Sequence, residues 1–122
     1  MADATTRLFG MLGFDMRAGK LTVGTEQVFA EMARPAPHRP KIVVFACDAS
    51  EGAKKKIRTK SEFYGIEAFE LPIAAEELGR RLGKSYTPVL VGVNDAGFAT
   101  EIRRALSDNT SGKEVSASSE TR

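Results

Sequence analysis

The chain has 122 residues, of which 42% are hydrophobic and 28% are charged, the balance of an ordinary globular domain. One cysteine and one histidine exclude an internal disulfide, a four-cysteine zinc site and any site that needs two histidines. The net charge is only +2, and no run of about 18 apolar residues predicts a membrane span, so we expect a cytoplasmic protein without a membrane partner.

The first half of the chain contains patterns for two helices and two strands. Apolar residues at helical spacing, from Leu8 to Met16, predict a helix over residues 5–18, which Gly19 ends. A short strand follows over 21–23, and a second helix begins at Gly24 or Thr25 and extends to about residue 33. Three prolines predict a stiff loop over 34–40, because proline breaks helices and central strands. The apolar, β-branched run over 41–46 is typical of a strand covered on both faces.

The second half of the chain repeats this alternation. Asp48 or Ser50 caps a helix that Gly65 ends, and a strand is expected over residues 66–71. Residues 74–82 form the clearest predicted helix, with two Glu→Arg pairs four positions apart. A buried strand over 88–93 and a helix capped by Asn94 complete the folded part.

Strands that alternate with helices favour parallel neighbours covered on both faces. We therefore predict an α/β fold, a three-layer α/β/α sandwich with a small mixed, mainly parallel sheet. The folded domain is expected over residues 1–106. Residues 107–122 are polar, with Val115 as their one large apolar residue, and predict a disordered C-terminal tail. In such sheets the ligand surface lies in the loops at one end of the strands.

The residue inventory argues against an enzyme, and we expect no catalytic residue, no metal and no cofactor. Cys47 follows an apolar strand and is interpreted as a small buried residue, since the single histidine, His38, lies in the proline loop. Serine-nucleophile, P-loop and dinucleotide-binding motifs are absent from the sequence. The helix start at Gly24 and Thr25 offers unpaired N–H groups, which leaves a phosphate-metabolite enzyme as a distant alternative.

Three surface features are candidates for binding. The first is the segment from Gly19 through Lys20 to Gln27, a loop that leads into a helix start. The second is the helix around Lys54–Lys60: five basic and two acidic residues between positions 48 and 60 give it a local charge of +3. The third is the polar loop over 83–87, with Lys84, Ser85 and Tyr86. A solvated lysine face and a tyrosine covering the edge of the core are the purely structural interpretations of the last two.

These segments together resemble a known RNA-binding superfamily, the seven-Ae and thirty-e type ribosomal proteins, which bind kink-turn RNA. The resemblance is closest to its small bacterial ribosome-associated branch and covers about residues 7–105. It is carried by Ala18-Gly19-Lys20-Leu21, Gly24-Thr25-Glu26-Gln27-Val28, Ala46-Cys47-Asp48-Ala49-Ser50, Lys54-Lys55-Lys56-Ile57, Glu77-Leu78-Gly79 and Gly83-Lys84.

The resemblance implies an RNA site at the start of the second helix, assisted by the loop before the last strand. Kink-turn binders begin this helix with Gly-Thr-Asn-Glu, followed three residues later by lysine. Gly24 and Thr25 match, but the following positions hold Glu26, Gln27 and Ala30. A glutamate accepts hydrogen bonds from guanine edges yet brings a negative charge near phosphates. These departures favour RNA binding in general over strict kink-turn specificity.

The sequence therefore predicts a non-enzymatic RNA-binding protein, a monomer that recognises structured ribosomal RNA and associates with the ribosome. Its candidate RNA-binding residues are Lys20, Gly24, Thr25, Glu26, Gln27, Lys84, Ser85 and Tyr86. In this hypothesis the lysines bind phosphate, Glu26 and Gln27 contact bases, and Tyr86 stacks on an unpaired base. The alternative is a protein-interaction module of the same fold that has lost RNA binding.

Overall fold

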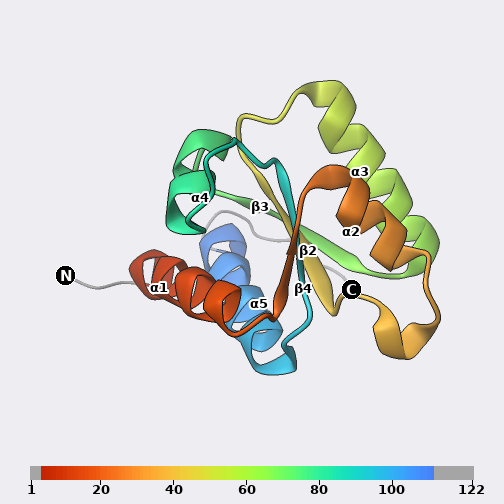
Figure 1. Cartoon of the computed structure of the whole chain (residues 1–122), viewed down its shortest axis with the longest axis horizontal. Coiled ribbons are helices and arrows are strands. Elements are labelled where there is room, and N and C mark those ends of the chain that lie inside the picture. Colours follow the sequence, from red (N-terminus) through yellow and green to blue (C-terminus); the bar gives the residue numbers. More distant parts are fainter. Residues whose placement is uncertain (1–3, 112–122) are drawn as a thin grey trace.

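The computed structural model describes residues 4–111, which form a four-stranded sheet between two layers of helices (Figure 1). The elements in chain order are α1 (Ala4–Arg17), β1 (Leu21–Val23), α2 (Thr25–Met32), a short 3-10 helix (Ala36–His38), β2 (Ile42–Ala46), α3 (Glu51–Tyr64), β3 (Glu67–Leu71), α4 (Ala75–Arg81), β4 (Leu90–Val93) and α5 (Ala96–Ser111). No helix in this described part is long and apolar enough to cross a membrane.

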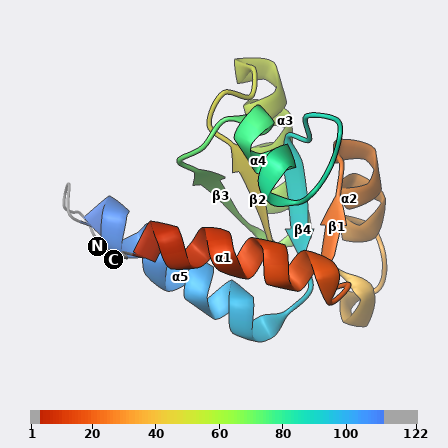
Figure 2. The ribbon, with the colours of Figure 1, turned by 60° about the vertical axis from the view of Figure 1, so that its left-hand side comes forward.

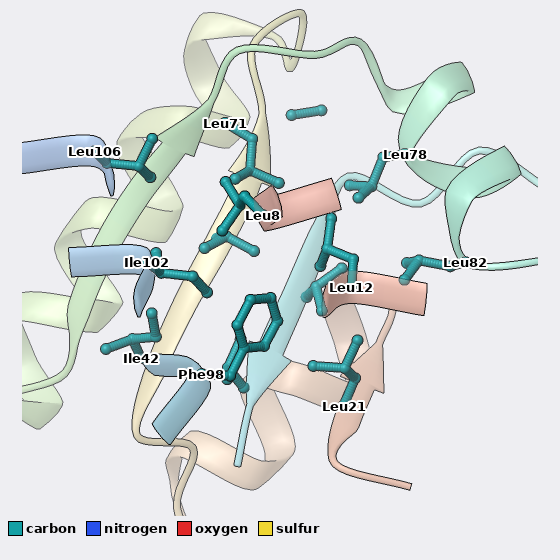
Figure 3. Packing of buried hydrophobic residues seen from close by; sticks show 14 of the residues in the cluster. Leu8, Leu12, Leu21, Ile42, Leu71, Leu78, Leu82, Phe98, Ile102 and Leu106 are labelled. Carbon is teal, nitrogen blue, oxygen red and sulfur yellow. The ribbon is translucent and has the colours of Figure 1, made fainter. Parts of the chain in front are cut away.

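The central strand β2 shows how the sequence produces three layers. All five of its residues are buried, and successive side chains point to opposite faces of the sheet. Ile42, Val44 and Ala46 pack into the core under α1, α4 and α5, which contains the leucines and Phe98 drawn in Figure 3. Val43 and Phe45 pack into a second core under α2 and α3. The predicted α/β/α sandwich with a mixed sheet is thus confirmed.

The strand directions correct one part of the prediction, because the sheet is not mainly parallel. The strand order is β1-β4-β2-β3, and β4 pairs antiparallel with both β1 and β2, whereas β2 and β3 are parallel. The strand β4 starts at the edge where β3 ends, although the connection over residues 72–89 is long enough for a parallel crossover. The loop after α4 is bonded back to Gly79 and leads directly into β4 at this edge.

Capping residues define the helix boundaries that the sequence left open. Ser50, not Asp48, is the N-cap of α3, where its hydroxyl accepts from the Ala53 N–H at 3.1 Å. Asp95, not Asn94, takes this role at the start of α5, because its carboxylate accepts from the Gly97 N–H at 2.9 Å. The proline loop contains a single 3-10 turn, in which the His38 N–H donates to the Pro35 carbonyl.

The last helix runs past the predicted domain boundary at residue 106. The helix α5 continues to Ser111, and its buried residues Phe98, Ile102 and Leu106 pack beside α1 (Figure 2). The rest of the predicted tail, residues 112–122, lies outside the described residues.

Candidate functional site

One edge of the sheet gathers the loops that the sequence singled out. At this edge β1, β2 and β3 end and β4 begins. The Gly24 N–H donates to the Leu90 carbonyl at 2.9 Å, which joins the start of α2 to the first residue of β4. The Ala46 N–H donates to the Val89 carbonyl at 2.9 Å, which attaches the end of β2 to the loop that precedes β4. Segments from opposite ends of the chain therefore meet here.

The start of α2 presents free hydrogen-bond donors. Gly24 lies at φ 115° and ψ 141°, a backbone conformation that a residue with a side chain rarely adopts. The first intrahelical bond runs from the Val28 N–H to the Gly24 carbonyl at 2.9 Å. The N–H groups of Thr25, Glu26 and Gln27 thus have no partner among the residues described, and all three side chains are exposed. They form the positive end of the helix dipole.

The loop between α4 and β4 leads into the start of β4 at this same edge (Figure 2). Four positions separate Tyr86 from Leu90, the residue bonded to Gly24. Tyr86 is 51% exposed, Ser85 is exposed and Lys84 is half-buried. We call Gly24–Gln27 together with Lys84–Tyr86 the strand-end surface. It combines backbone donors, one carboxylate, one ammonium group and one accessible aromatic ring.

Gly79 of α4 fixes the position of this loop. The Lys84 N–H donates to the Gly79 carbonyl at 2.8 Å, and the Gly83 N–H donates to the Arg80 carbonyl at 3.1 Å. A Cβ atom on Gly79 would lie 2.5 Å from the Tyr86 carbonyl oxygen and 2.9 Å from Cδ of Pro88. Only glycine therefore allows the helix and the loop to approach this closely.

Lys20 does not belong to the strand-end surface, and this corrects the grouping expected from the sequence. The Lys20 carbonyl accepts from the Asn94 N–H at 2.9 Å, which places it beside the end of β4, at the opposite edge of the sheet. Lys20 and Gly24 flank the three residues of β1 and are four positions apart, a span of roughly 13 Å along an extended chain. The positive charge of Lys20 lies instead near Asp15 and Asp95.

Asp15 and Asp95 form a carboxyl pair between α1 and the start of α5. Asp15 is only 1% exposed, and its Oδ2 atom is buried without a partner in the described part of the chain. Burial, the hydrogen bond with Asp95 and the charge of Asp95 raise the pKa of Asp15 to about 6. Burial alone would raise the pKa of Asp95, but hydrogen bonds from Asp15 and from the Gly97 and Phe98 amides lower it.

The basic helix predicted around Lys54–Lys60 is divided between two environments. Lys54 and Arg58 pair with Glu70 of β3, at 3.3 and 3.5 Å. The ammonium groups of Lys56 and Lys60 lie over the ring of Phe29, at 5.7 and 5.2 Å from its centre. Two of the five basic side chains therefore share one carboxylate, that of Glu70.

Asp48 was expected to cap the helix over residues 51–64, and Gly79 was not among the candidate binding residues. Asp48 accepts from the Ala75 N–H at 2.9 Å and so caps α4, which carries the loop. The position of Gly79 inside a predicted helix could have revealed its role. Glycine there lowers helix stability by about 1 kcal/mol relative to alanine, so its presence indicates a close contact that a larger residue would block. No group of three or more potential metal ligands lies close together within residues 4–111.

A family model of ribosomal proteins, described as the ribosomal protein L7Ae/L30e/S12e/Gadd45 family, matches residues 6–103. An RNA-binding protein YlxQ from Enterococcus faecium is 35% identical over 100 residues, which cover 82% of this chain and 91% of that protein. Its namesake from Bacillus subtilis (strain 168) is 34% identical over 94 residues, with coverage of 77% and 89%. Both relatives are named RNA-binding proteins, in agreement with the RNA-binding prediction from the sequence.

Two solved structures share this fold. A protein of unknown function from Bacillus halodurans superposes with a TM-score of 0.72 at 30% identity, covering 83% of this chain and 97% of that one. The Giardia lamblia 15.5kD RNA binding protein superposes with a TM-score of 0.64 at 11% identity, with coverage of 88% and 89%. At that identity the second similarity concerns the fold alone.

Proposed function

Because the chain belongs to the ribosomal protein L7Ae/L30e/S12e/Gadd45 family, we propose that it binds structured RNA through the strand-end surface. The observation that carries this proposal is the hydrogen bond between the Gly24 N–H and the Leu90 carbonyl, which holds both halves of the surface at one edge. The names of the two YlxQ relatives support an RNA ligand. The target is kink-turn-like ribosomal RNA, bound by a monomer that associates with the ribosome in the cytoplasm.

Each component of the surface matches a feature of folded RNA. The free N–H groups at the start of α2 bind phosphate or base oxygens, and Gly24 allows the RNA to approach the backbone. Lys84 neutralises a phosphate, and Tyr86 stacks on an unpaired base. The carboxylate of Glu26 accepts hydrogen bonds from the N1–H and N2–H donors of guanine, while Gln27 both donates and accepts. Glu26 thereby favours guanine edges over additional phosphate.

A gel shift with total ribosomal RNA tests RNA binding itself. Retention that weakens as the salt concentration rises supports the proposal, because phosphate contacts release counterions. An absence of retention at low salt refutes it and favours the alternative, a protein-interaction module of the same fold.

A short kink-turn oligonucleotide tests the assignment of residues and target. Lys84→Ala should weaken binding and lower the slope of log K against log salt by about one, since one phosphate contact is lost. Lys20→Ala is the matched control, because Lys20 lies at the opposite edge and should leave both quantities unchanged. Equal losses for the two lysines would contradict the assigned surface. An oligonucleotide with its G·A pairs converted to Watson–Crick pairs tests the kink itself and should bind more weakly.

A further inference from the structure

The end of α3 carries an aromatic ring that the fold does not use. Phe63 is 80% exposed, although a phenylalanine ring normally packs into a core. Three large apolar side chains are exposed in the described part of the chain. Tyr86 belongs to the strand-end surface, and Phe14 lies on α1 in the other helical layer. Phe63 is separate from both, because α3 spans roughly 20 Å between the edge of the strand-end surface and the opposite edge.

The backbone beneath Phe63 is held rigidly by Arg39 of the proline loop. The guanidinium donates through Nε to the Arg34 carbonyl at 2.6 Å and through Nη1 to the Tyr64 carbonyl at 3.2 Å. It also lies 5.4 Å from the centre of the Tyr64 ring. Phe63 and Tyr64 meet edge to face, with ring centres 4.9 Å apart and planes at 83°. The exposed ring is therefore positioned before any partner arrives, which lowers the entropic cost of binding.

Cations without carboxylate partners lie on the same helix as Phe63 and in the neighbouring proline loop. Lys60 lies one turn before Phe63 on α3, and Lys56 lies one turn before Lys60. Both lie over the ring of Phe29, and neither pairs with a carboxylate of the described residues, in contrast to Lys54 and Arg58. Arg39 adds a third positive charge beside Tyr64. Glu62 precedes Phe63, but the helix turns it by about 100° away from that side chain.

This chemistry favours RNA over protein as the occupant. Lysine is depleted in protein–protein interfaces, and a stable one buries about 1,200–2,000 Å² of total surface, far more than a single ring supplies. One accessible ring beside unneutralised cations is instead the arrangement that holds a stacked base and its flanking phosphates.

We propose that Phe63 is a second RNA contact, a stacking site for an unpaired base, with Lys60, Lys56 and Arg39 binding the flanking phosphates. The contact extends the proposed function to a second surface. An RNA bound at the strand-end surface would reach it along α3 through a single-stranded flank.

A labelled oligouridylate of about 16 nucleotides tests this contact by fluorescence anisotropy, because it has no kink and no paired bases. Phe63→Ala should weaken its binding by about 5- to 150-fold, which corresponds to the ~1–3 kcal/mol that stacking of one base contributes. Lys60→Ala should lower the slope of log K against log salt by about 0.7. Phe14→Ala is the matched control, since Phe14 is 63% exposed on α1, and it should leave the affinity unchanged.

The same measurement separates this contact from the strand-end surface. If Tyr86→Ala weakens oligouridylate binding and Phe63→Ala does not, the proposed function stands and the second contact is refuted. If the wild-type chain does not bind oligouridylate, or if Phe63→Ala and Phe14→Ala bind equally well, the second contact is also refuted, and a protein becomes the occupant to test. A loss confined to the Phe63 and Lys60 variants supports it.

Discussion

Replacing Gly79 by alanine tests whether packing between α4 and its following loop positions the RNA-binding residues. The new Cβ would lie 2.5 Å from the Tyr86 carbonyl oxygen and 2.9 Å from Cδ of Pro88. Both neighbours are stiff, one a backbone atom and the other a ring atom. To bring the shorter contact to about 3 Å, the loop must shift by at least roughly 0.5 Å.

The expected cost combines two opposing effects. Overpacking a close contact costs about 1–3 kcal/mol, while alanine improves helix propensity by up to about 1 kcal/mol. We therefore expect Gly79→Ala to lower the free energy of unfolding by ~1–2 kcal/mol. Because the shifted loop carries Lys84 and Tyr86, affinity for a kink-turn oligonucleotide should fall at least about fivefold, a loss of roughly 1 kcal/mol of stacking.

Urea denaturation and anisotropy titration measure the two effects separately. Gly10→Ala is the control, because no atom lies within 4 Å of the Cβ that it would add to α1. That variant should gain up to about 1 kcal/mol of stability and bind RNA as the wild type does. A Gly79→Ala protein that is more stable than the wild type and binds equally well would refute this account of the loop.

Three further predictions concern stability. Gly24→Ala should cost ~1–3 kcal/mol, measured by urea denaturation, because φ 115° strains a side-chain-bearing residue and the new Cβ meets Oε1 of Gln27. Folding raises the pKa of Asp15 to about 6, so the stability that its proton provides is full below about pH 4 and is lost as the pH rises through about 6. Asp15→Asn should remove this loss and raise the free energy of unfolding at pH 7.5 by roughly 1–3 kcal/mol. If the variant and the wild type lose the same stability between pH 5 and pH 7.5, the assignment of this pH dependence to Asp15 is wrong. Asp48→Ala should cost about 1–2 kcal/mol and Asp48→Asn much less, because the Ala75 N–H loses its cap only in the first variant.

Local patterns in the sequence were sufficient for the helices and for the layered fold. The apolar run that became β2 is buried on both faces, as its composition predicts. The direction of β4 did not follow from such patterns. It depends on the edge of the sheet at which the connection after β3 enters β4, and an alternation of helices and strands carries no information about that edge.

The candidate site shows the same division between local and tertiary information. Gly24 and Tyr86 were predicted together from motifs, and the pairing of β1 with β4 brings their segments to one edge. Lys20 precedes Gly24 by only four positions, yet these positions cross the sheet from one edge to the other. Gly79 acts through a contact with a loop five or more residues away, and Asp15 acts through a residue of α5. Such contacts exist only after folding, so sequence spacing does not reveal them.

The last strand to be synthesised occupies an interior position of the sheet, between β1 and β2. A growing chain that has not yet released β4 therefore leaves β1 without its neighbour and lacks the carbonyl that anchors Gly24. The domain therefore completes its sheet and forms the strand-end surface in the same step, when β4 leaves the ribosome during translation. Truncated products that end before Leu90 should be unable to compete with the finished protein for its target.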